Sequence, residues 1–118
     1  MKIILSGERA PSLNKIYQSR HWTYRKKIVD DIHEKVKLVL SKEKDLKMFD
    51  CRVDILVTAY FDKRCLDSSN IVLKIYEDAL KGIVIKDDSH KYVRRVSTQS
   101  EIDRSGSRVE IEIFPIDN

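Results

Sequence analysis

The sequence predicts an α+β fold, with a small mixed β-sheet of about four strands and two α-helices packed on one face. Two segments repeat apolar residues every three or four positions, as helices do, and four shorter segments have the composition or the alternation of strands. The 118 residues are enough for one hydrophobic core. We therefore expect residues 1–118 to form a single domain.

Two strands are predicted in the first half of the chain. Residues 2–7, KIILSG, form a short apolar run that ends at a glycine. Residues 51–61, CRVDILVTAYF, alternate apolar and more polar side chains, which is the pattern of a strand with one buried face. Between them, residues 8–22 show no clean period, so we expect a long ordered loop before the first helix.

Two helices are predicted, over about 23–46 and about 69–80. In the first, Ile28, Ile32 and Val36 begin an apolar stripe with helical spacing. In the second, Ser68 or Ser69 is placed to cap the first turn, and Gly82 follows the last turn. The helices therefore precede and follow the strand at 51–61.

The C-terminal part of the chain predicts two further strands. Residues 92–100, YVRRVSTQS, and 107–114, SRVEIEIF, both alternate, and residues 101–106 contain a glycine. This arrangement predicts a β-hairpin.

Composition limits the function. The formal net charge is +4 and the calculated pI is about 9.1, which suits an anionic partner such as nucleic acid.

Cys51 and Cys65 are too few for a disulfide framework, so we expect two reduced thiols. The N-terminal apolar run is too short for a signal peptide, and no run suffices to cross a membrane. We therefore expect a cytoplasmic protein with no membrane partner.

Acidic residues bracket the second helix. Asp67 precedes it, and Asp87 and Asp88 follow its end. At 100° per residue, five polar side chains share one face of this helix. They are Asn70, Lys74, Glu77, Asp78 and Lys81.

These acidic residues allow two interpretations. In the first, the polar face is a solvated surface on which Lys74 and Asp78 form an i,i+4 ion pair. In the second, the acids hold Mg²⁺, because adjacent carboxylates repel unless a cation lies between them and Mg²⁺ prefers oxygen ligands. The metal would activate water for attack on a phosphodiester. Nearby basic residues would then hold phosphates, namely Lys74, Lys86, Lys91, Arg94 and Arg95.

The run from Asp67 to Asp88, DSSNIVLKIYEDALKGIVIKDD, resembles the central motif of RusA-type Holliday junction resolvases, which are common in phages and prophages. That motif has acidic residues before an asparagine, then a lysine, Asp-Ala-Leu, a glycine and an Asp-Asp pair. Upstream, residues 10–14, APSLN, are similar to the family's Pro-Pro-Ser-x-Asn segment. Aromatic and basic residues follow in both, here including Tyr17, Trp22 and Arg25.

The resemblance implies a bacterial or phage-encoded, Mg²⁺-dependent endonuclease that acts on branched DNA as a homodimer and resolves four-way junctions by paired nicks. It implies that Asp67, Lys74 and Asp88 are catalytic. Asp67 and Asp88 would be metal ligands, with Asp87 as a further candidate. The residues that we expect to contact DNA are Asn14, Arg25, Lys26, Asn70, Lys91 and Arg94.

One departure from the family pattern concerns the metal ligands. The usual motif has two acids two residues apart, whereas this chain has Asp67 and then Ser69. Asp78, on the same helix, is the candidate for the third ligand. Two alternatives follow from the missing acid and from the unknown substrate shape: a DNA-binding protein that has lost catalysis, or a nuclease for other branched or flapped DNA.

Overall fold

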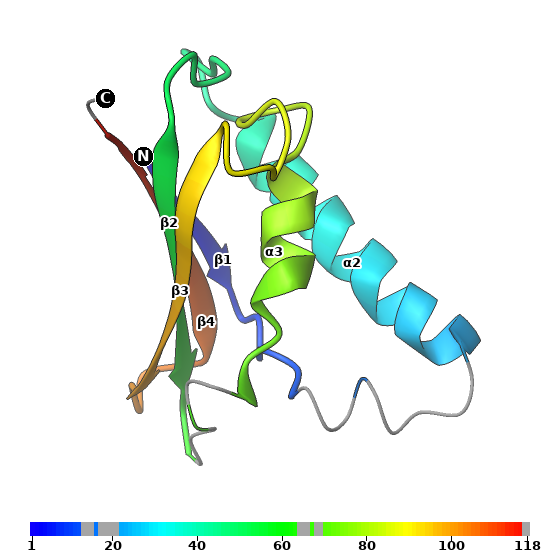
Figure 1. The fold of residues 1–118 in the computed structure, drawn as a ribbon. Coiled ribbons are helices and arrows are strands. Elements are labelled where there is room, and N and C mark those ends of the chain that lie inside the picture. The colour runs from blue at the N-terminus through cyan, green and yellow to red at the C-terminus, as the bar shows by residue number, and fades with distance from the viewer. Residues whose placement is uncertain (13–15, 17–21, 64–66, 68–69, 117–118) are drawn as a thin grey trace.

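The computed structural model describes residues 1–12, 16, 22–63, 67 and 70–116. It contains a four-stranded mixed sheet, and both helices lie on the same side of this sheet (Figure 1). The predicted α+β fold is therefore confirmed. The elements in chain order are β1 (Lys2–Ser6), α2 (Trp22–Leu40), β2 (Val53–Phe61), α3 (Leu73–Leu80), β3 (Val93–Ile102) and β4 (Arg108–Pro115).

The strand order is β1-β4-β2-β3, so the predicted hairpin of the last two strands is wrong. β2 lies between them, pairing in parallel with β3 and antiparallel with β4. The chain does reverse at the turn between β3 and β4, but the turn carries β4 past β2 to its far side. Local turn residues predict the reversal, whereas long-range pairing with the apolar β2 decides which strands become neighbours.

The segment β2–α3–β3 is a crossover between parallel strands. Parallel strands need such a crossover, and α3 supplies it while covering one face of the sheet. The side chains of Val53, Ile55, Val57, Ala59 and Phe61 are almost completely buried, as the alternation in the sequence predicts. The core thus lies between this face of the sheet and the two helices.

Helix α2 ends at Leu40 rather than at the predicted residue 46. Leu40 is the last buried residue of its apolar stripe, and the following SKEKD segment is fully polar. Because this segment has no apolar face to bury, extending the helix through it would gain little from tertiary packing.

His33 of α2 donates a hydrogen bond from Nε2 to the carbonyl oxygen of Ile75 at 3.2 Å, which joins the two helices. Neither described helix is both long and apolar enough to cross a membrane.

Helix α3 begins at Leu73, four residues later than predicted. Val72 occupies the position before it, with no side-chain cap, and the predicted caps Ser68 and Ser69 lie outside the described residues. Ile71 is instead paired in an antiparallel bridge with Ser12. This pairing holds the chain extended before the helix, and it joins the two segments that carry the motifs.

Candidate active site

Helix α3 presents one buried and one polar face. Its apolar side packs into the core through Ile75, Tyr76, Ala79 and Leu80. On the other side, Nζ of Lys74 lies 3.2 Å from Glu77 and 3.0 Å from Asp78, and Nζ of Lys81 lies 3.2 Å from Asp78. The predicted polar face is confirmed for Lys74, Glu77 and Asp78, whereas Asn70 lies before the helix and Lys81 is the residue that follows its last turn.

A tight turn after α3 brings the next acidic residues back toward the helix. The carbonyl oxygen of Leu80 accepts hydrogen bonds from the amides of Ile83, Val84 and Ile85. Gly82 has a φ of 77° and donates to the carbonyl oxygen of Ile85 at 2.7 Å. Glycine adopts this left-handed conformation without the steric cost of a Cβ. Because Val84 and Ile85 are buried, the turn is anchored in the core just before Asp88.

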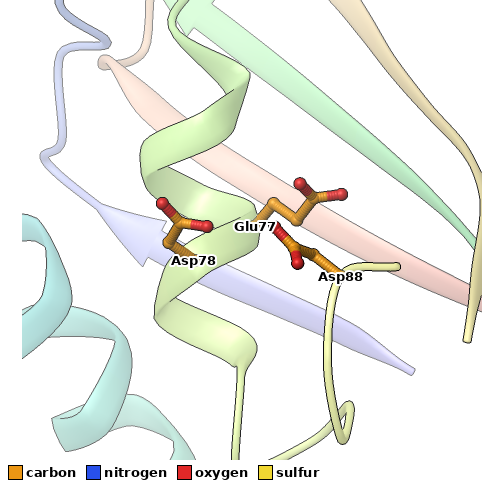
Figure 2. A group of neighbouring side chains, drawn as sticks. All are labelled: Glu77, Asp78 and Asp88. Carbon is orange, nitrogen blue, oxygen red and sulfur yellow. The ribbon is translucent and has the colours of Figure 1, made fainter. Parts of the chain in front are cut away.

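Three carboxylates meet where this turn faces α3. They belong to Glu77 and Asp78 on the helix and to Asp88 on the following loop (Figure 2). One carboxylate oxygen from each residue lies within 4.8 Å of those of the other two. We call these three residues the acidic cluster. Glu77 is its most buried member, with a side chain only 8% exposed.

Two lysines partly neutralise the acidic cluster. Nζ of Lys74 contacts all three carboxylates, including a hydrogen bond to Oδ2 of Asp88. Nζ of Lys81 lies 3.1 Å from the same oxygen of Asp88. These hydrogen bonds, first from Lys74 and then from Lys81, hold the pKa of Asp88 well below its ordinary value. In turn, the hydrogen bond to Asp88 raises the pKa of Lys74 above its usual range. At neutral pH Asp88 is therefore a carboxylate and Lys74 an ammonium ion.

The acidic cluster fits a hard divalent cation. Carboxylate oxygens are the ligands that Mg²⁺ prefers, and the ammonium of Lys74 already places a positive charge among all three groups. Oδ1 of Asp78 is buried and lies 3.0 Å from Nζ of Lys74 and 3.2 Å from Nζ of Lys81, so this oxygen already faces positive charge. A carboxylate oxygen in such a position is a ligand of the type that Mg²⁺ prefers.

The structure brings together only some of the predicted site residues. Lys74, Asp78 and Asp88 meet in the cluster. Asp67 and Asp87 are exposed, and among the described residues neither belongs to a group of three acids or other ligands within 4.8 Å. Their roles as ligands stay predictions. Ser69, which stands where the family motif has its second acid, lies outside the described residues.

Glu77 is a member of the cluster that we did not propose as a ligand from the sequence. It is predicted on the polar face of the helix, but its side chain is buried, and that burial depends on tertiary packing that helix spacing does not give. The available signal was its spacing from Lys74 at i,i+3 beside Asp78 at i,i+4, which places both acids within reach of one lysine.

A groove of about 380 Å³ adjoins the acidic cluster between α2 and α3. Its walls include Lys74 and Asp78 from the site, together with Arg25 and Lys26, two of the residues expected to contact DNA. Trp22, whose side chain is largely exposed, lies at the same groove. Cations beside an exposed ring are typical of surfaces that bind single-stranded nucleic acid.

The other residues expected to contact DNA are placed differently. Lys91 and Lys86 both lie over the ring of Tyr92, with Nζ 5.7 and 5.9 Å from its centroid. They form a basic pair on the turn that carries Asp88. Arg94 is already paired with Asp54 through two hydrogen bonds of 3.1 and 2.6 Å. Asn70 is half-buried, and Asn14 lies outside the described residues.

Comparison with known proteins agrees with the motifs. The family model described as endodeoxyribonuclease RusA matches residues 7–114. No curated protein matches the chain. The matched residues include both helices, all of the acidic cluster and most of the sheet. The chain therefore belongs to the RusA endodeoxyribonuclease family.

Proposed function

We propose that this protein is a Mg²⁺-dependent endonuclease that acts as a homodimer and resolves four-way DNA junctions by paired nicks. Membership of the family supports nuclease activity, and the family resemblance supports the junction, the dimer and the metal. A dimer would supply the two active sites that paired nicks require.

The observation that carries this proposal is the position of Lys74. Its ammonium group contacts three carboxylates that suit Mg²⁺, and its side chain also lines the groove that contains Arg25 and Lys26. An acidic, metal-competent site and two cationic side chains that could bind phosphates thus meet at one residue. Metal-dependent phosphodiester hydrolysis combines both features at the same position.

Each group has a distinct part in the proposed reaction. Glu77, Asp78 and Asp88 would hold Mg²⁺, which would supply positive charge against the charge that develops on the phosphate during cleavage. Lys74 would contact an oxygen of the scissile phosphate. Arg25 and Lys26 would hold neighbouring phosphates and orient the strand.

The direct test is incubation of the protein with a synthetic four-way junction and with linear duplex, each in Mg²⁺ and in chelator. We expect paired nicks in the junction, in Mg²⁺ alone. Asp88→Asn should abolish nicking while leaving junction binding, because the substitution removes charge from the acidic cluster. Asp45→Asn, at an exposed acid outside the acidic cluster, is the matched control, and Asp87→Asn tests whether the acid next to Asp88 takes part.

Nicking by Asp88→Asn at the rate of the unmodified protein would contradict the proposed site. Tight junction binding without nicking by any form of the protein would identify a DNA-binding protein that has lost catalysis. Equal cutting of flaps and junctions would indicate a broader branched-DNA nuclease. Asp67→Asn, tested in parallel, decides whether the exposed acid before α3 takes part.

A further inference from the structure

The ammonium group of Lys74 lies among the three carboxylates that are proposed to hold Mg²⁺. Its Nζ is 3.2 Å from Oε1 of Glu77 and 3.0 Å from Oδ1 of Asp78, and it donates a hydrogen bond to Oδ2 of Asp88. Lys81, by contrast, contacts only Asp78 and Asp88. A single ammonium group thus serves all three carboxylates of the acidic cluster.

The charges of the site do not favour a divalent cation alongside both lysines. Three carboxylates and two ammonium groups leave one net negative charge. A divalent ion added to this group would reverse its sign and place three cations a few ångströms apart, which is costly in a partly buried site. If Lys74 leaves, one lysine and one divalent ion balance the three carboxylates.

The groove beside the acidic cluster offers space for a displaced Lys74 side chain. Its side chain is 54% exposed and lines the groove of about 380 Å³ beside Arg25 and Lys26. Lys81 is less exposed, at 37%, and is not among the residues that line this groove. A change of rotamer would carry the Lys74 ammonium from the carboxylates toward the groove, where the DNA phosphate is expected.

We propose that Lys74 is the resident counter-ion of the metal site: without metal its ammonium group pairs with Glu77, Asp78 and Asp88, and a divalent cation displaces this group into the adjoining groove. This inference rests on the proposed function, which places Mg²⁺ at the acidic cluster. It makes the release of Lys74 toward the phosphate a consequence of metal binding. Mg²⁺ and the Lys74 ammonium group would then be available to the phosphate at the same time.

The test measures metal binding without DNA. Mn²⁺ affinity is determined by calorimetry at constant pH and ionic strength for the unmodified protein and for Lys74→Gln, Lys74→Arg, Lys81→Gln and Lys37→Gln. Removing the competing charge should tighten Mn²⁺ binding by about tenfold or more in Lys74→Gln. Lys74→Arg should show no such gain, and Lys81→Gln a smaller one. Lys37, exposed on α2, is the matched control and should leave the affinity unchanged.

A second measurement uses the unmodified protein and does not depend on how the variants fold. The NMR signal of the Lys74 ammonium group, assigned from its loss in Lys74→Arg, should show faster exchange of its protons with water when Mg²⁺ is added. Equal Mn²⁺ affinities of Lys74→Gln and the unmodified protein, or an ammonium signal indifferent to Mg²⁺ that binds, would overturn the counter-ion role alone. Absence of Mn²⁺ binding in every form would overturn the metal site of the proposed function as well.

Discussion

Oε1 of Glu77, a carboxylate whose side chain is only 8% exposed, lies 3.2 Å from Nζ of Lys74 in the preceding turn of α3. A buried carboxylate is stable only when it is paired, and this pair faces the turn that carries Asp88. The acid that the usual motif places before the asparagine is absent here, and Glu77 provides a third carboxylate from within the helix.

The first prediction concerns Glu77→Gln. The amide has the same shape, and Lys74 keeps Asp78 and Asp88 as partners, so the free energy of unfolding should change by no more than about 1 kcal/mol. Nicking of a four-way junction in Mg²⁺ should fall by about 100-fold or more, since changes to groups that merely support metal ligands already cost 10- to 100-fold. Glu34→Gln, exposed on α2, is the control. Unchanged nicking by Glu77→Gln would exclude it as a ligand.

The sequence predicts which segments form helices and strands more accurately than it predicts which strands lie next to each other. The strand and helix types follow from periodicity, and Lys74 with Asp78 and Asp88 follows from motif spacing. The hairpin prediction was wrong because a local turn signal contains no information about β2, which inserts between β3 and β4. Strand pairing of that kind is decided by burial of residues far apart in the chain.

In the candidate site, too, local geometry could be predicted from the sequence, whereas the outcome of tertiary packing could not. The helical face that carries Lys74, Asp78 and Glu77 could be predicted, because helix geometry is local. The burial of Glu77 could not be predicted, because it depends on how α3 packs against segments that are distant from it in the sequence. Exposure likewise separates Asp88 from the adjacent Asp87, although the two are equivalent in the sequence pattern.

The second prediction concerns Tyr76, which is fully buried on the inner face of α3. In the described part of the chain its hydroxyl has no hydrogen-bond partner, and burial, with a smaller effect of the Glu8 carboxylate, raises its pKa above the usual range. A buried, unpaired hydroxyl is destabilising, so Tyr76→Phe should raise the free energy of unfolding by about 1 kcal/mol in urea denaturation. Tyr60→Phe, at a half-buried ring, should change it by less than about 0.5 kcal/mol. A loss of stability in Tyr76→Phe would show that the hydroxyl has a partner.

The third prediction concerns pH and the turn between β3 and β4. Hydrogen bonds from the Ser105 hydroxyl, from Arg108 and from the Ser105 amide hold the pKa of Asp103 well below its ordinary value of 3.8. A carboxylate whose pKa is lower in the folded state stabilises that state above its unfolded pKa, and this stability is lost as the pH falls toward the folded value. The stability difference between the unmodified protein and Asp103→Asn should therefore be full at pH 7 and shrink below about pH 4. A difference independent of pH would show that the charge of Asp103 does not matter.

The fourth prediction concerns the groove beside the acidic cluster. Arg25 lines it together with Lys74 and is expected to neutralise one DNA phosphate, whereas Lys37 lies farther along α2 and outside it. Loss of one phosphate contact weakens binding for every sequence and lowers the slope of log affinity against log salt by about one. Arg25→Ala should show this change for a four-way junction in chelator, where no cleavage interferes, and Lys37→Ala should keep the slope of the unmodified protein. Equal slopes for the two variants would mean that the DNA does not follow this groove and that Lys74 meets the scissile phosphate from another direction.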